Sequence, residues 1–112
     1  MECIFCKIVA GKAHGEVLYQ DDLVTAFRDI HPIAPVHLLI VPNRHIASVN
    51  HVDAADEPAL GRMFRVARQL AAEMGIAESG YRLSVNTGFD GGQAVHHLHM
   101  HLLGGRRMRR MG

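Results

Sequence analysis

The sequence predicts an α+β domain built on a five-stranded antiparallel sheet, with one long helix and a short N-terminal helix. Short segments of strand character lie on both sides of a single amphipathic helical stretch, and repeated strand–helix alternation is absent. Hydrophobic residues make up 48% of the 112 residues, which suits one domain with a modest core. We expect this domain to occupy residues 1–105, with a basic tail over residues 106–112.

The first expected element is a short helix over residues Ile4 to Ala10. Segments of strand character, separated by turn residues, then predict five strands. These are Val17–Tyr19, Val24–Arg28 and His37–Val41 before the long helix, and Arg82–Asn86 and His97–Leu103 after it. The turn Gln20-Asp21-Asp22 predicts that the first two strands form a hairpin.

The long helix is predicted from apolar residues at the i, i+3, i+4, i+7 spacing, which gathers them on one stripe. The stripe consists of Leu60, Met63, Phe64, Ala67, Leu70, Ala71 and Met74. We expect the Asp56 side chain to accept the unpaired amides of the first turn, and Gly75 to end the helix in the left-handed conformation. Such a stripe needs a sheet to cover.

Charge and hydropathy argue against two classes of partner. The formal net charge is +1, without the basic excess of a protein that binds nucleic acid. The longest apolar runs, such as residues 38–41, fall far short of the roughly 20 residues of a membrane-spanning helix.

The first residues lack the features of a secretory signal, so we expect a cytoplasmic protein. A chain this short would also gain stability from an interface with a second copy.

Nine histidines stand out in the composition, and three of them alternate near the C-terminus. Because side chains alternate across a strand, His97, His99 and His101 are expected on one face, with the intervening apolar residues on the other. We expect the histidine face to be accessible to a ligand. Such a row can chelate a divalent metal, or one ring can act as an oriented nucleophile, and the spacing alone leaves both open.

The row resembles the signature of the histidine triad (HIT) nucleotide-binding proteins, and further segments resemble the Hint branch in the same order. These segments are residues 3–8, 26–30, 35–46 and 85–93. The resemblance implies a HIT domain that forms a homodimer and hydrolyses purine nucleoside phosphoramidates through a covalent nucleotidyl-histidine. It implies His99 as the nucleophile, with His101 and His37 close to the phosphate.

The resemblance also implies a nucleotide pocket. Asp29 would accept hydrogen bonds from the ribose hydroxyls, and Asn86 would hold the phosphate or the loop before the triad. An apolar slot for the base would consist of Phe5, Ile8, Phe27 and Ile30. The glycine-rich loop ahead of the triad lets backbone amides approach phosphate oxygens, so the expected nucleotide contacts include Gln93, Ala94 and Val95. Ala94 stands where the family often has serine, and we expect an altered leaving-group preference or slower turnover.

Some bacterial relatives bind zinc, and the resemblance places a structural zinc site on Cys3, Cys6, His45 and His97. Two thiolates and two imidazoles suit tetrahedral Zn²⁺. The alternative is two buried thiols without metal.

Three other functions are compatible with the residues: a nucleotide-binding or interaction module with little turnover, a dinucleoside polyphosphate hydrolase, and a metal-dependent hydrolase whose ligands are the histidine row.

In the Hint branch the C-terminus reaches toward the other subunit, but the familiar Trp-Pro-Pro-Gly ending is absent here. We therefore expect Arg106, Arg107, Arg109 and Arg110 to form a solvated, frayed tail.

Overall fold

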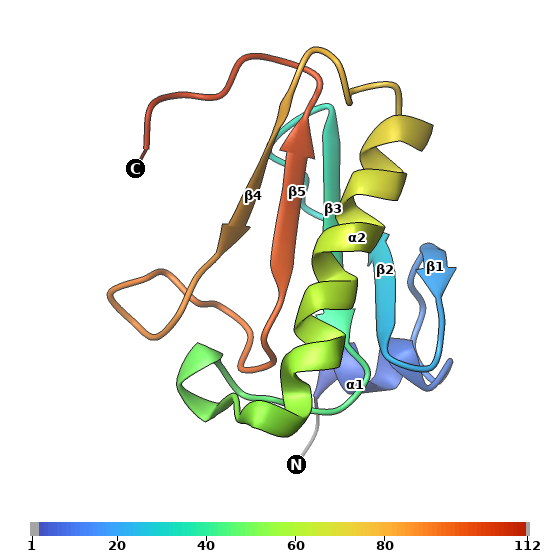
Figure 1. The fold of residues 1–112 in the computed structure, drawn as a ribbon, viewed down its shortest axis with the longest axis vertical. Helices are drawn as coiled ribbons and strands as arrows, with labels where there is room; N and C mark the ends of the chain where they lie inside the picture. Colours follow the sequence, from blue (N-terminus) through green and yellow to red (C-terminus); the bar gives the residue numbers. More distant parts are fainter. Residues whose placement is uncertain (1–2, 112) are drawn as a thin grey trace.

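A computed structural model describes residues 3–111 and places two helices on opposite faces of one sheet (Figure 1). The helices are α1 (Ile4–Val9) and α2 (Glu57–Glu73), with the 3-10 turns Val49–His51 and Ala54–Asp56 ahead of α2. The strands are β1 (Val17–Gln20), β2 (Val24–Arg28), β3 (Val36–Pro42), β4 (Tyr81–Val85) and β5 (Met100–Gly104). The predicted fold class is confirmed. The predicted ends of the domain and tail at residues 1, 2 and 112 lie outside the described residues.

The sheet has the order β1-β2-β3-β5-β4, and all neighbouring strands are antiparallel. The central pair is β3 and β5, in which Leu38 lies opposite Leu102 and Leu39 lies opposite His101. Because side chains alternate, this register sends the two leucines of the first pair to one face and Leu39 with His101 to the other. The predicted division of the triad segment between two faces is confirmed for this strand.

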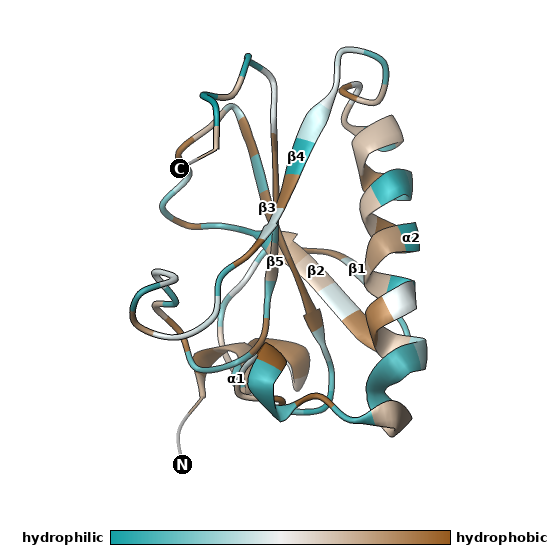
Figure 2. Cartoon of the chain, turned by 60° about the vertical axis from the view of Figure 1, so that its left-hand side comes forward, coloured by the Kyte–Doolittle hydropathy of each residue, from teal (hydrophilic) through white to brown (hydrophobic). Residues whose placement is uncertain are grey.

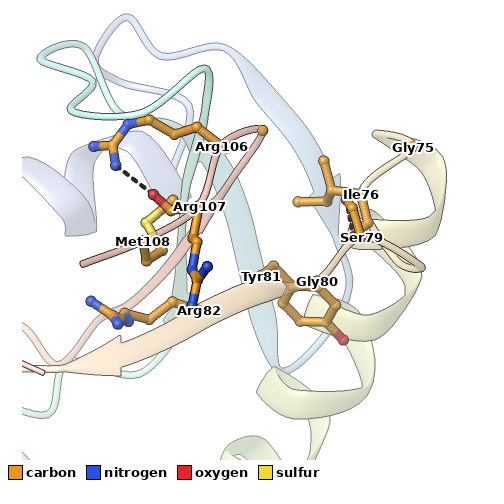
Figure 3. A pocket seen from close by; sticks show the side chains of 10 residues that line it. Gly75, Ile76, Ser79, Gly80, Tyr81, Arg82, Arg106, Arg107 and Met108 are labelled. Atoms are coloured by element: carbon orange, nitrogen blue, oxygen red, sulfur yellow. Dashed lines mark hydrogen bonds between the residues drawn. The ribbon is translucent and has the colours of Figure 1, made fainter. Parts of the chain in front are cut away.

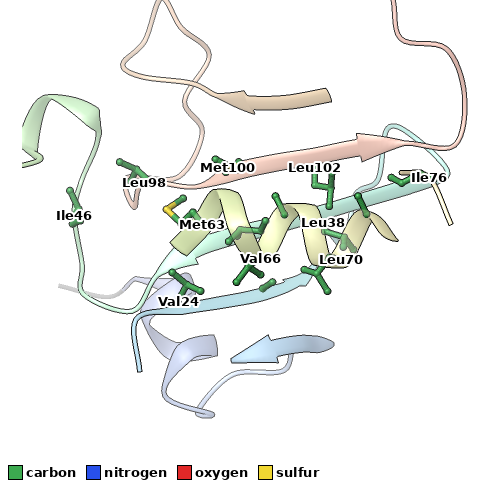
Figure 4. Packing of buried hydrophobic residues seen from close by; sticks show 14 residues of the cluster. Val24, Leu38, Ile46, Met63, Val66, Leu70, Ile76, Leu98, Met100 and Leu102 are labelled. Atoms are coloured by element: carbon green, nitrogen blue, oxygen red, sulfur yellow. The ribbon is translucent and has the colours of Figure 1, made fainter. Parts of the chain in front are cut away.

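The face of the sheet that carries Leu38 and Leu102 packs against α2, which stands beside the sheet in Figure 2. The buried residues of this core, drawn in Figure 4, are Val24, Ala26, Leu38, Ile40, Ile46, Met63, Val66, Ala67, Leu70, Ala71, Ile76, Leu98, Met100 and Leu102. A smaller cluster of Phe5, Ile8, Phe27, Leu39 and Val41 joins α1 to the opposite face. The larger core therefore holds the sheet rigid while the α1 face remains available for a site.

The stripe predicted for α2 is wrong at one position. Phe64 is 59% exposed, whereas Val66, outside the predicted stripe, is fully buried. Successive residues of a helix are about 100° apart, so Phe64 lies at the edge of the stripe whose centre is occupied by Met63 and Leu70. A large apolar side chain is consequently left on the outer flank of α2.

The predicted N-terminal cap of α2 is also wrong, whereas its C-terminal end is confirmed. Asp56 makes no side-chain cap hydrogen bond, because its backbone is already helical and its carboxylate accepts hydrogen bonds from Arg44 and from the Asp53 amide. Asp53 instead caps the preceding 3-10 turn. Gly75 has φ +75°, the left-handed conformation expected after the last turn.

The last strand begins at Met100, three residues later than predicted. The register that pairs Ile40 with Met100 would place Leu98 opposite Pro42, which has no amide hydrogen to continue the ladder. The Leu98 amide donates to the Ile46 carbonyl at 2.7 Å instead. His97 and His99 therefore lie in an unpaired segment ahead of β5.

The C-terminal tail is tied to the domain, which corrects the expectation of a frayed end. Arg106 donates to the Ile33 carbonyl at 2.8 Å, and Arg82 of β4 donates to the Arg109 carbonyl. Figure 3 shows the hollow of about 730 Å³ between this tail and the α2–β4 connection. No helix within residues 3–111 is long and apolar enough to cross a membrane.

The packing of α2 predicts unequal costs for two substitutions on the same helix. Leu70→Ala removes a side chain that is 1% exposed, and the lost burial plus the cavity should lower the free energy of unfolding by about 2–5 kcal/mol. Arg68→Ala, on the exposed face, should change it by less than about 0.5 kcal/mol. Urea unfolding checks both values, and equal losses would contradict the assigned core.

Candidate active site

A cavity of about 500 Å³ lies on the α1 face, between α1, the β2–β3 connection and β5. Ten predicted site residues line it: Phe5, Ile8, Phe27, Asp29, Ile30, His37, Ala94, Val95, His99 and His101. Asn86 and Gln93 do not line it, and neither do the predicted metal ligands Cys3, Cys6, His45 and His97. The expectation of an accessible row of three histidines is thus wrong for His97, which is fully buried.

The ring of His99 has one defined tautomer. Its Nδ1 lies 2.7 Å from the backbone carbonyl of His97. A carbonyl oxygen only accepts, so Nδ1 carries the proton and Nε2 keeps its lone pair. Because His99 lines the cavity, this unprotonated nitrogen is available as a nucleophile.

His37 and His101 continue the same logic. The Ile33 amide donates to His37 Nδ1 at 3.1 Å, so the proton of neutral His37 is on Nε2. That Nε2 lies 2.9 Å from His101 Nδ1 and 3.3 Å from a carboxylate oxygen of Asp29. His101 therefore accepts at Nδ1 and carries its own proton on Nε2, where it is a donor for the cavity.

Burial keeps both of these rings neutral. Burial, with smaller contributions from the neighbouring rings of His99 and His37, lowers the pKa of His101 to about 4 against the opposing carboxylate of Asp29. Burial also lowers the pKa of His37, again opposed by Asp29. At neutral pH His37 and His101 are therefore uncharged imidazoles with fixed donor and acceptor atoms.

Asp29, His37 and His101 lie close enough to suggest a cation site, with ligand atoms within 4.8 Å of one another. The tautomers argue against it, since His37 Nδ1 already accepts a backbone amide and Nε2 has no free lone pair while the ring is neutral. These residues form a hydrogen-bonded chain. Among the described residues, the groups whose ligand atoms lie close enough to share one ion do not include His97, His99 and His101 together, which argues against a metal-dependent hydrolase that uses this row as its ligands.

The apolar wall of the cavity comes from α1 and β2. Phe5 packs edge-on against Phe27 with ring centroids 5.3 Å apart, and against His99 with centroids 5.2 Å apart. Phe5, Phe27 and Ile8 are buried, whereas Ile30 is exposed at the rim. The four residues predicted to surround the base thus lie together, with Phe5, Ile8 and Phe27 in the smaller core and Ile30 at the open edge of the cavity.

The loop before the triad is held by side chains expected to contact nucleotide. The Gln93 amide donates to the carbonyls of Ala47 and Val95 at 2.7 and 3.0 Å, and accepts from the Gly88 amide. Asn86 donates to the Gly91 carbonyl at 2.6 Å. The two side chains thus shape the loop, which corrects the prediction for Gln93 and agrees with one of the two roles predicted for Asn86.

The same loop offers donors beside His99. A side chain at Gly91 would collide with the Thr87 backbone, so only glycine permits this turn. Within residues 3–111 the backbone amides of Ala94 and Val95 make no hydrogen bond. Two such N–H groups at the edge of the cavity suit an anionic group.

The predicted zinc ligands form a second centre next to the cavity. The ligand atoms of Cys3, Cys6, His45 and His97 lie within 4.8 Å of one another. His97 Nε2 donates to the Pro42 carbonyl at 2.9 Å, which leaves a lone pair on Nδ1. That Nδ1 lies 3.4 and 3.5 Å from the two sulfurs, and His45 Nδ1 lies 3.3 Å from the Cys6 sulfur.

These distances fit a tetrahedral ion, for which Zn–S of about 2.3 Å and Zn–N of about 2.0–2.1 Å place sulfur and nitrogen roughly 3.5 Å apart. Burial and the adjacent Cys3 raise the pKa of the Cys6 thiol. A metal that binds here must therefore displace a proton from Cys6. The donor set, the spacing and the free lone pair of His97 all fit zinc.

Several residues that line the cavity have no role predicted from the sequence, among them His14, His31 and Ile33. His31 and Ile33 follow Asp29 closely in sequence, and that proximity could have indicated them. His14 lies in the α1–β1 connection, and no local pattern brings it to the β2–β3 connection.

Comparison with known proteins gives consistent matches. A family profile for the HIT domain matches residues 10–108. The chain is 59% identical to the purine nucleoside phosphoramidase of Escherichia coli K12 over 105 residues, which cover 94% of this chain and 88% of the relative.

Solved structures agree as well. A HIT family hydrolase from Legionella pneumophila has TM-score 0.94 and 47% identity, covering 97% of each chain. A histidine triad protein from Clostridium difficile has TM-score 0.95 and 38% identity, covering 100% of this chain and 97% of that one.

The low pKa of His101 predicts a pH dependence of stability. Unfolded histidine titrates near about 6.5, so between that value and about 4 the unfolded chain binds a proton that the folded chain does not. Stability contributed by neutral His101 is complete above about pH 6.5 and is lost as the pH falls. Between about pH 7 and 5, the free energy of unfolding of the wild type should fall by about 2 kcal/mol more than that of His101→Asn. Parallel curves for the two proteins would contradict the assignment.

Proposed function

Because the chain belongs to the histidine triad (HIT) family, we propose that it is a purine nucleoside phosphoramidase that acts through a covalent nucleotidyl-histidine at His99. The observation that carries the proposal is the unprotonated Nε2 of His99 in the cavity, fixed by the bond from Nδ1 to the His97 carbonyl. The name of the Escherichia coli relative supports the substrate class.

In the first step His99 Nε2 attacks phosphorus, the phosphorus–nitrogen bond breaks, and the amine leaves after taking a proton from water. The His97 carbonyl stabilises the positive charge that develops on the His99 ring. His101 Nε2–H donates toward the phosphoryl group, and its Nδ1 is held by His37. In the second step water attacks the same phosphorus and loses a proton to solvent, the bond from phosphorus to His99 Nε2 breaks, and the nucleoside monophosphate and neutral His99 are released.

The amides of Ala94 and Val95 donate to phosphoryl oxygens, which gain charge during transfer. Asp29 accepts from the ribose hydroxyls with the lone pairs that remain beside its bond from the His31 amide. The base lies in the slot formed by Phe5, Phe27, Ile8 and Ile30. Ala94 supplies no hydroxyl, and neutral His101 donates a hydrogen bond but not a proton, so the leaving amine takes its proton from water.

The second centre is proposed to hold one structural zinc ion on Cys3, Cys6, His45 and His97. Zinc would supply a cross-link between α1 and the segment before β5. Cysteines that bind metal and form no disulfide are typical of a reducing compartment, which supports the expected cytoplasmic location.

We also propose a homodimer that buries the β4 edge and the neighbouring flank of α2. β4 is an edge strand of the sheet. Arg62 contacts Asp21 of the β1–β2 turn, and Phe64 lies about 200° from it around the helix, so Phe64 is on the flank toward β4. Phe64 and Val85 of β4 are both exposed, at 59% and 40%. An apolar flank next to an unpaired strand edge suits a second copy.

The nucleophile proposal predicts that His99→Ala lowers kcat/KM for adenosine 5′-phosphoramidate by at least about 10³-fold. Its Kd for AMP should stay within about three-fold, because the base slot and Asp29 are untouched. Mass spectrometry of rapidly quenched wild type should detect a nucleotidyl adduct on the peptide that contains His99. Residual activity in the variant within about ten-fold of the wild type would rule out His99 as the nucleophile.

The dimer proposal predicts that Phe64→Glu shifts the protein from dimer to monomer in sedimentation equilibrium, since a charge at the flank would be buried without a partner. Circular dichroism should report an unchanged fold. A wild type that stays monomeric at all accessible concentrations would contradict this proposal.

A further inference from the structure

The helix α1 serves two sites at once. Cys3 precedes it and Cys6 lies within it, and both sulfurs point to His97. Phe5 and Ile8, on the same helix, line the cavity that contains His99. One short helix thus carries half of the sulfur–nitrogen cluster and the apolar wall of the nucleotide pocket.

His97 joins the same two sites from the other side. Its Nδ1 faces the sulfurs, its Nε2 donates to the Pro42 carbonyl, and its backbone carbonyl accepts the proton of His99 Nδ1. A shift of the His97 ring toward or away from the sulfurs therefore acts on the residue whose carbonyl fixes the nucleophile. No intervening chain separates the two contacts, because both belong to one residue.

Phe5 provides a second connection. Its ring packs edge-on against His97 with centroids 5.9 Å apart and against His99 with centroids 5.2 Å apart. It lies between Cys3 and Cys6 in the sequence, so the position of this ring follows that of the two sulfurs. Any shift of α1 that changes the position of the sulfurs therefore also changes the packing of the Phe5 ring against His99.

The helix is held by the packing of Phe5 and Ile8 in the smaller core and by contacts at both of its ends. It spans six residues, far below the length at which an isolated helix is stable in water. Gln20 donates to the Val9 carbonyl at 2.9 Å and holds the C-terminal end. The N-terminal end is attached through the sulfur–nitrogen cluster and the packing of Phe5.

From this arrangement we propose that Cys3, Cys6 and His45 are positioning residues for the active site, such that a thiophilic divalent ion on the cluster and a purine nucleoside monophosphate in the cavity bind with positive cooperativity. The proposal rests on the proposed nucleotide site and zinc site. The ion holds α1 against His97, and α1 then forms the wall against which the base packs. Thermodynamic linkage makes the effect reciprocal, so bound nucleotide strengthens ion binding by the same factor.

The test compares three forms of the full chain: zinc-loaded wild type, wild type stripped by a chelator, and Cys3→Ser/Cys6→Ser. Metal analysis of wild type purified without chelator should give about one zinc per chain, and of the variant less than about a tenth. Calorimetry should give an AMP Kd about ten-fold weaker for the stripped wild type and for the variant than for the loaded protein. Chelator should leave the variant's Kd unchanged, which makes the variant the matched control.

Two further readouts separate coupling from loss of structure. Competition with a chromophoric chelator should give a zinc affinity that rises with AMP by the same factor as the AMP affinity rises with zinc. Hydrogen exchange should increase over residues 4–9 on metal removal and stay unchanged in β3 and β5. A variant that had merely unfolded would lose protection in the strands too.

Several results would overturn the proposal: less than about a tenth of a zinc per wild-type chain, AMP affinities within two-fold with and without zinc, or no AMP binding by the loaded protein. Hydrolysis of the phosphoramidate is measured separately. Zinc-dependent AMP binding without hydrolysis would retain the coupling and reject the proposed reaction. Hydrolysis with zinc-independent AMP binding would do the reverse.

Discussion

The hydrogen bond from His99 Nδ1 to the carbonyl of His97 is the contact on which the rest of the site depends. It fixes which nitrogen of the ring is bare, and it places a full backbone dipole behind the ring where positive charge develops during attack. The other contacts of the site either hold His97 and His99 in place or face the substrate that His99 attacks. The chain of Asp29, His37 and His101, of which only His37 is fully buried, contacts the substrate through neutral rings of fixed tautomer.

The fold places these groups through the pairing of β3 with β5. Leu39 lies opposite His101 on the α1 face, and His37 lies two residues from Leu39, so the two imidazoles meet diagonally across the ladder. The opposite faces of the same strands carry Leu38 and Leu102 into the core beneath α2. Rigidity of the site and burial of the core therefore come from one alternating pattern.

Much of this was predictable because alternation and helical spacing are local properties. The five strands, both helices and the turn at Gly75 follow from such patterns. The start of β5 was not predictable in the same way, because it depends on Pro42 lying opposite Leu98. Phe64 is exposed although it was expected in the core, because it lies at the edge of the apolar stripe. Asp56 does not cap α2 as expected, because its carboxylate accepts hydrogen bonds from Arg44. The tautomers depend on the partner of each ring, such as the His97 carbonyl for His99 and the Ile33 amide for His37, and the spacing of the histidines does not reveal these partners.

The roles assigned to His99 and its neighbours meet in one measurable property, the position of a proton on one ring. Nitrogen-15 NMR of histidine-labelled protein at neutral pH, with His99 assigned through the His99→Gln variant, reports which ring nitrogen is protonated. The structure predicts a protonated Nδ1 and a bare Nε2 in the protein without nucleotide. A proton on Nε2, or on both nitrogens, would contradict the account, because the ring would then have no lone pair to offer phosphorus.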